Sequence, residues 1–136
     1  MENIVNAVIL ANNKILTVKR KTDPWAGMYG LPGGHIEEKE NKIEALKREI
    51  KEETGFEIGL DESNFLGAET LKYASRKFDI LFYKAKITGG EPSPQKEEIE
   101  EIKWLGFDEF IQGLKKFGFS LDEIKGISKM IKLAAS

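Results

Sequence analysis

Residues 34–56 read GHIEEKENKIEALKREIKEETGF, and this stretch is the most informative part of the sequence for the fold and for the chemistry. An amphipathic helix over residues 42–54 is predicted because apolar residues recur there at i, i+3 and i+7. These apolar residues are Ile43, Leu46 and Ile50. Asn41 followed by Glu44 fits an N-cap with its capping-box partner, and Gly55 fits the position at which a helix ends.

Three carboxylates gather on one side of this predicted helix. Glu49, Glu52 and Glu53 stand at i, i+3 and i+4, so they repel one another unless a cation neutralises them. Mg²⁺ accepts oxygen ligands and bridges to phosphates, which makes a metal site one interpretation. The alternative is a solvated charged face that Lys47 and Lys51 neutralise, and helix spacing alone leaves both open.

The residues beside the helix favour a built site. Pro32, Gly33 and Gly34 let the backbone pass close to a ligand and present carbonyl oxygens to it. Glu40 and Arg48 have opposite charges, so they are expected to pair and to pin the loop to the helix. A metal ion would then gain a backbone oxygen as well as carboxylates.

Composition narrows the class of protein. The 136 residues predict a single domain, residues 1–136, and the net charge of −2 excludes a nucleic-acid binder that depends on bulk positive charge. There is no cysteine and one histidine, so a metal would need oxygen ligands, as Mg²⁺, Mn²⁺ and Ca²⁺ prefer. No apolar run approaches 18 residues and the N-terminus does not resemble a signal peptide, so we expect a cytoplasmic protein.

The remaining elements predict a layered α/β fold in the order β-β-α-β-β-β-α-α. Strands are expected at 3–10, 15–20, 64–73, 77–87 and 99–105, and loops at 21–30 and 89–94. Residues 80–83 (ILFY) are apolar on both faces, which indicates a strand covered on both sides. Two helices close the chain, the first ended by Gly118 and the second capped by Ser120 with Glu123. Their apolar residues are Phe110, Leu114 and Phe117 in the first, and Ile124, Ile127, Ile131 and Ala134 in the second.

The stretch 34–56 resembles the Nudix box, G-x5-E-x7-R-E-U-x-E-E-x-G-U, in which U is a bulky apolar residue. Every fixed position is filled: Gly34, Glu40, Arg48, Glu49, Ile50, Glu52, Glu53, Gly55 and Phe56. Lys39 stands where many members have glycine, at a position that the box leaves free. The resemblance extends over about residues 3–110 and is to MutT-like Nudix hydrolases. It implies a mixed β-sheet sandwiched between α-helices.

The resemblance also implies chemistry. Nudix hydrolases cleave a nucleoside diphosphate linked to another group, with attack by water and with Mg²⁺ or Mn²⁺. By position, the implied metal-binding groups are Gly34, Glu49, Glu52, Glu53 and Glu98, with Glu97 as the next candidate after Glu98. The implied catalytic residues are Glu49, Glu52 and Arg48; Glu40 orients the loop with Arg48, and Gly55 is structural.

Substrate contacts are assigned outside the box. By resemblance to some members of the family, Arg20 is expected to contact the phosphates; the alternative is an exposed cation at the end of a strand. Trp25 and Tyr73 are expected to stack on a nucleobase; the alternative is that they pack in the core or at its rim. His35 is interpreted as a loop residue and Trp104 as a core anchor.

The favoured activity is (deoxy)nucleoside triphosphate pyrophosphohydrolysis. The alternatives are hydrolysis of ADP-ribose, another nucleotide sugar or a dinucleoside polyphosphate, and a nucleotide-binding module without activity. We expect a small nucleotide as partner, with no nucleic acid polymer and no membrane. The sequence leaves open whether the protein is a monomer or a homodimer, which phosphorus is attacked and how many metal ions bind. It also leaves open which residue is the general base: Glu49, Glu97 or Glu98.

Overall fold

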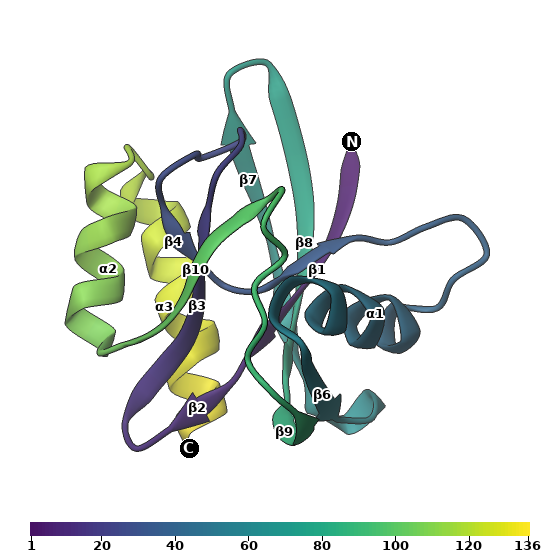
Figure 1. The fold of residues 1–136 in the computed structure, drawn as a ribbon. Coiled ribbons are helices and arrows are strands. Elements are labelled where there is room, and N and C mark those ends of the chain that lie inside the picture. Colours follow the sequence, from purple (N-terminus) through teal and green to yellow (C-terminus); the bar gives the residue numbers. More distant parts are fainter.

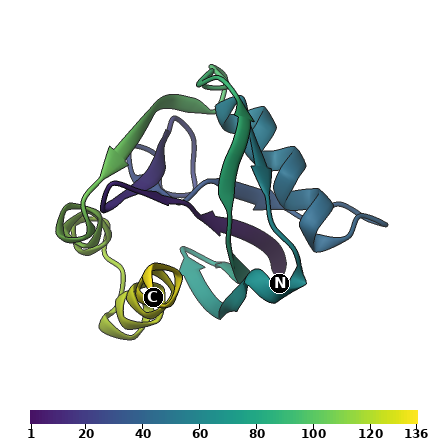
Figure 2. The same cartoon turned by 90° about the horizontal axis from the view of Figure 1, so that it is seen from below.

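The computed structural model describes residues 1–136 and places β-sheets between helices on two sides (Figures 1 and 2). Helix α1 (Lys42–Thr54) covers one side, and α2 (Phe107–Lys116) and α3 (Leu121–Ala135) cover the other. This confirms the predicted mixed sheet between helices and the three helices themselves.

The largest sheet has the strand order β5-β1-β8-β7. Strand β1 (Glu2–Val8) runs antiparallel to β5 (Gly33–His35) and parallel to β8 (Arg76–Lys84). Strand β7 (Phe65–Tyr73) pairs with β8 as a hairpin and forms the edge. The β1–β5 pairing places Gly33 and Gly34 beside the helix that follows them in the chain.

Two smaller sheets complete the structure. In one, β3 (Lys14–Arg20) lies between β2 (Leu10–Ala11) and β10 (Ile99–Leu105), and β4 (Tyr29–Gly30) also pairs with β3. In the other, β6 pairs with β9, and a short 3-10 turn, η1, follows β6. Their bounds are Phe56–Gly59 for β6, Lys86–Gly90 for β9 and Glu62–Asn64 for η1.

Strand β8 contributes to two separate apolar clusters. Ile80 and Phe82 pack with α2 and α3, whereas Tyr83 packs on the other face with Leu46 and Ile50 of α1. The prediction that residues 80–83 are covered on both sides is therefore confirmed. Burial of both faces fixes the register, because a shift of one residue would exchange them.

Several predicted boundaries are wrong. The strand expected at 77–87 ends at Lys84, and the chain then crosses to another sheet, where Lys86–Gly90 pairs with β6. Gly89 and Gly90 therefore belong to a strand and not to the predicted loop 89–94. The strand expected at 3–10 divides after Val8, and the loop expected at 21–30 ends in β4. Strands β5 and β6 were not predicted: β5 (GGH) is glycine-rich and lacks an alternating pattern, and β6 (FEIG) alternates over only four residues.

The helix ends mostly follow the sequence. Gly55 adopts φ 81° at the end of α1, and Ser120 forms a capping box with Glu123 at the start of α3. The capping box expected at Asn41 is incomplete: the Asn41 side chain accepts from the Glu44 backbone N–H, but Glu44 accepts from the Asn41 side-chain amide. The first end of α1 is therefore capped by one bond to its backbone and not by two.

Candidate active site

A cavity of about 360 Å³ opens beside β5 and α1, and it has two chemically different ends. The acidic end is lined by Gly33, Gly34, Glu49, Glu53 and Glu98. The apolar end is lined by side chains that include Trp25, Leu71, Phe78, Phe110 and Phe119. Arg20 and His35 also line the cavity.

Glu53 is buried at the acidic end, with 3% of its surface exposed. Its Oε1 accepts a hydrogen bond of 2.8 Å from the Gly33 backbone N–H. Burial raises the pKa of Glu53 to about 8, against the lowering effect of the Gly33 N–H, and the neighbouring Glu49 and Glu98 carboxylates raise it further. Arg20, which lines the same cavity, lowers the pKa of Glu53, but burial is the larger effect.

Glu49 lies directly against the backbone of Gly34. A Cβ atom added to Gly34 would come within 2.3 Å of the Glu49 Cδ, so a larger residue here would displace the Glu49 side chain. Burial raises the pKa of Glu49, although Arg48 acts in the opposite direction.

Arg48 is the centre of the polar contacts on this helix. It donates to Glu40 Oε2 at 2.7 Å and Oε1 at 3.0 Å, which confirms the expected pair, and to the His35 carbonyl at 3.1 Å. It also donates to Glu49 Oε1 at 2.9 Å and Glu52 Oε2 at 3.3 Å. One guanidinium therefore joins the loop after β5 to two of the three carboxylates clustered on α1, Glu49 and Glu52.

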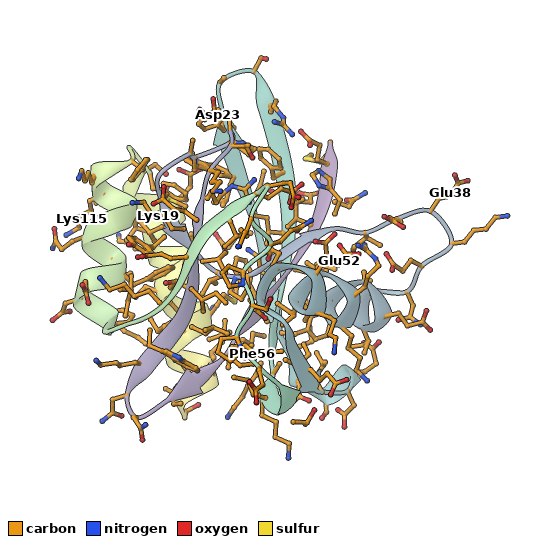
Figure 3. The ribbon with its side chains drawn as sticks, viewed as in Figure 1. Lys19, Asp23, Glu38, Glu52, Phe56 and Lys115 are labelled. Atoms are coloured by element: carbon orange, nitrogen blue, oxygen red, sulfur yellow. The ribbon has the colours of Figure 1, made fainter.

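The remaining glutamates of the predicted set lie in different places. Glu98 lines the cavity beside Glu53 and Glu49, whereas Glu97 does not. Glu52 is also absent from the cavity wall; its side chain is 49% exposed on α1, in contact with Arg48 (Figure 3). Of the predicted metal-binding groups, the structure therefore gathers Gly34, Glu49, Glu53 and Glu98 at one cavity and leaves Glu52 at its outside.

The donor set suits a hard divalent cation. All its side-chain donors are carboxylate oxygens, which such cations prefer. Burial raises the pKa of Glu49 and Glu53, and a bound cation would favour their ionised forms. No three acidic or histidine side chains meet in coordinating geometry, so binding requires side-chain rotation. Glu52 is exposed enough to turn. Nudix hydrolases generally use divalent metal ions.

Trp25 packs within an aromatic cluster at the apolar end. Its ring centroid lies 5.2 Å from that of Tyr73, 5.4 Å from Phe78 and 5.2 Å from Phe119. Tyr73 itself does not line the cavity; its hydroxyl donates to Asp23 Oδ1 at 2.9 Å. Of the two predicted base-stacking residues, the structure therefore brings only Trp25 to the cavity wall.

The structure also places two further residues singled out in the sequence, Arg20 and Trp104. The Arg20 Nε donates to the Pro24 carbonyl at 2.8 Å, which holds the guanidinium at the cavity. Trp104 is partly buried against the cluster around α1, as expected for a core anchor.

Sequence reasoning missed a polar group at the cavity rim. Glu2 accepts from Arg76 at 2.6 and 2.8 Å and lies 2.9 Å from the His35 Nε2, and Arg76 and His35 both line the cavity. The parallel pairing of β1 with β8, which sets Glu2 opposite Phe78, brings these residues together. No local sequence pattern predicts that pairing.

A family model described as the NUDIX domain matches residues 2–124. The chain belongs to the Nudix family. Its Nudix box is the stretch 34–56 that supplies Gly34, Glu49 and Glu53 to the cavity.

Known proteins support the assignment. An 8-oxo-dGTP diphosphatase of Buchnera aphidicola is 33% identical over 118 residues, 86% of this chain and 83% of the relative. The crystal structure of a MutT NUDIX hydrolase from Burkholderia pseudomallei superposes with a TM-score of 0.70 and 31% identity, over 79% of this chain and 84% of that chain. The chain is therefore a MutT-like Nudix pyrophosphatase, which confirms the expected enzyme class.

A shorter match is to a protein named for a different activity. An ADP-ribose pyrophosphatase of Methanocaldococcus jannaschii is 53% identical over 51 residues, which are 38% of this chain and 30% of the relative. The named relatives therefore differ in substrate. In this Nudix chain, none of the helices has the length and apolar character needed to cross a membrane.

Proposed function

We propose that this Nudix chain is a Mg²⁺-dependent nucleoside triphosphate pyrophosphohydrolase, with residues 1–136 as one catalytic domain. The observation that carries the proposal is one cavity with the carboxylates of Glu49, Glu53 and Glu98 at one end and the Trp25 cluster at the other. Such a cavity suits a ligand with a polyphosphate at one end and a flat base at the other. The 8-oxo-dGTP diphosphatase relative, matched over most of both chains, supports the same class.

The metal-binding groups in this proposal are the Gly34 carbonyl and the carboxylates of Glu49, Glu52, Glu53 and Glu98. Mg²⁺, or Mn²⁺ in its place, neutralises phosphate charge and lowers the pKa of a bound water. The exposed Glu52 turns away from Arg48 to join the set, since their 3.3 Å contact is an exposed i, i+4 pair. Glu53 keeps its bond from Gly33 N–H through one oxygen and offers the other.

The protein's own residues position the reactants. A water oxygen forms a bond to one phosphorus, the bridging P–O bond breaks, and a proton passes from the water to a cavity carboxylate. Arg20, held by the Pro24 carbonyl, faces the phosphates, and Trp25 stacks on the base. Arg48 and Glu40 hold the loop after β5, so that the Gly34 carbonyl keeps its place.

A substrate panel tests the proposal. Purified protein is incubated with Mg²⁺ and the common dNTPs, 8-oxo-dGTP, ADP-ribose and diadenosine tetraphosphate, and products are separated by ion-exchange chromatography. We expect a nucleoside monophosphate and pyrophosphate from at least one triphosphate, at a higher kcat/KM than for the other classes. Absence of triphosphate hydrolysis would overturn the proposal.

ADP-ribose is the second candidate. The observation that favours it is the 53% identity over 51 residues to the Methanocaldococcus jannaschii ADP-ribose pyrophosphatase. The same panel separates the two, because hydrolysis of ADP-ribose yields AMP and ribose 5-phosphate without pyrophosphate.

A further inference from the structure

The segment Gly90–Glu98, which we call the strap, connects β9 to β10 and carries Glu98 to the cavity. Its first half is fixed to the end of α1. The Ser93 N–H donates to the Thr54 carbonyl at 2.7 Å, and the Gln95 N–H donates to the Glu53 carbonyl at 3.2 Å. The strap is therefore attached to the backbone of the same residue whose carboxylate is buried in the acidic end.

Two glycines let the strap approach this closely. A Cβ atom on Gly55 would lie 2.3 Å from the Glu91 carbonyl oxygen, and one on Gly90 would lie 2.3 Å from the Gly55 carbonyl oxygen. Both residues also have φ near +80°, where side chains are strained. The beginning of the strap is thus fixed by direct backbone contact.

The end of the strap is a tight turn that Lys21 contacts from outside. Within the turn, the Glu98 and Ile99 N–H groups donate to the Gln95 carbonyl at 3.1 and 2.8 Å. From outside, the Lys21 N–H donates to the Glu98 carbonyl at 2.8 Å, and the Lys21 Nζ donates to the Lys96 carbonyl. Lys21 therefore binds the turn at two points, one of them through its side chain.

Glu98 has no comparable support for its side chain. Its carboxylate makes no hydrogen bond or ion pair, and the residue is exposed at the cavity wall. The backbone of the turn therefore fixes only the point from which this side chain extends. A contact that holds the turn keeps that point beside the acidic end, within reach of Glu53.

We propose that Lys21 is a positioning residue for hydrolysis: its ammonium binds the turn of the strap from outside and so helps to hold Glu98 at the acidic end of the cavity. This rests on the proposed function, in which Glu98 belongs to the metal-binding set. Lys21 itself does not line the cavity, so it acts through the strap and not on the substrate.

The test compares Lys21→Met with Lys21→Arg. Methionine keeps much of the apolar stem and removes the donor, whereas arginine restores a donor. Loss of one hydrogen bond typically changes a free energy by about 0.5–1.5 kcal/mol, so kcat should fall about threefold to tenfold in Lys21→Met. We expect KM to stay within about twofold and Lys21→Arg to recover most of the loss. Lys96→Met is the matched control, because it alters an exposed lysine of the same turn and leaves its carbonyl in place.

A double mutant separates positioning from general loss of structure. If Lys21 acts through Glu98, Lys21→Met should add no further loss of kcat to Glu98→Gln, whereas independent effects multiply. The substrate is the best triphosphate of the panel with Mg²⁺, and thermal unfolding of every variant checks the fold.

The outcomes distinguish the two proposals. An active wild type with unchanged kcat in Lys21→Met, or with multiplying effects in the double mutant, overturns the role of Lys21 alone. An active wild type with full activity in Glu98→Gln also overturns it. A wild type that hydrolyses no nucleotide of the panel overturns the proposed function, and the role of Lys21 with it.

Discussion

The two ends of the cavity are built in opposite ways. The acidic end takes Gly33, Gly34, Glu49 and Glu53 from one short stretch of chain and adds Glu98 through the strap. The apolar end takes its side chains from the loop after β3, from β7 and β8, from α2 and from the link between α2 and α3, elements that can be traced in Figure 1. Most of the groups proposed to bind the metal thus lie close together in sequence, whereas those proposed to contact the rest of a substrate do not.

The two ends also differ in the forces that hold them. Directed bonds fix the acidic end, such as the 2.8 Å bond from Gly33 N–H to Glu53 and the bonds from Arg48 to Glu40. Ring packing around Trp25 fixes the apolar end. Changes at the acidic end should therefore reduce kcat, and changes at the apolar end should raise KM.

Removal of the divalent metal should have the largest effect. We expect excess EDTA to abolish hydrolysis and added Mg²⁺ to restore it, because the clustered carboxylates cannot bind phosphates without a cation between them. The measurement is product formation from the best triphosphate. Full activity in EDTA would remove the metal from the proposed mechanism.

Glu53→Gln should have the next largest effect. The change keeps the shape and the acceptor for the Gly33 N–H but removes a charge, so kcat should fall on the order of 100-fold, about 3 kcal/mol of transition-state stabilisation. Lys47→Gln, on the exposed face of the same helix, should change kcat little. Near wild-type turnover in Glu53→Gln would show that Glu53 is not an essential ligand.

Trp25→Ala should affect substrate binding more than turnover. Stacking of a base on an aromatic ring is worth about 1–3 kcal/mol, so KM should rise about tenfold or more while kcat changes little. Trp104→Ala is the control, since Trp104 is also partly buried but packs against the cluster around α1. Equal KM values in the two variants would place the base elsewhere.

The smallest expected effect is on stability and depends on pH. Without metal, the folded Glu53 keeps its proton up to a pKa of about 8, while the unfolded residue loses it near 4.5. The folded state binds more protons between these values, so the free energy of unfolding should fall as pH rises from 5 to 8. Thermal unfolding in EDTA should show a decrease in Tm over this pH range that is smaller in Glu53→Gln. Identical slopes would argue that Glu53 is ionised at neutral pH.

The sequence predicts the acidic end well because its geometry is local. Helix spacing places Glu49 and Glu53 on one side of α1, and Gly55 ends that helix as expected. The same spacing does not reveal that Glu52 stays outside the cavity in contact with Arg48, because that depends on how α1 lies against β5. The resemblance to the Nudix box, and not the spacing, indicates Glu98.

The apolar end was predicted poorly for a physical reason. Trp25 and Tyr73 are both aromatic and both near the cavity, but Tyr73 points its hydroxyl to Asp23 and leaves the wall to Phe78 and Phe119. Which aromatic faces inward depends on strand register and on how the residues between α2 and α3 pack. Neither is encoded in a local periodicity, so single-sequence reasoning has no signal for it.

The parallel pairing of β1 with β8 has a consequence for folding kinetics. It joins residues 2–8 to residues 78–84, and β5, with Gly33 and Gly34, pairs with the other edge of β1. Contacts between such distant segments form slowly, because a long loop must close before they contribute. Because β8 follows the Nudix box in the chain, the box emerges from the ribosome first, and its helix then has no complete sheet to pack on. The sheet that supports the acidic end is therefore complete only after the strand at 76–84 has been inserted beside β1.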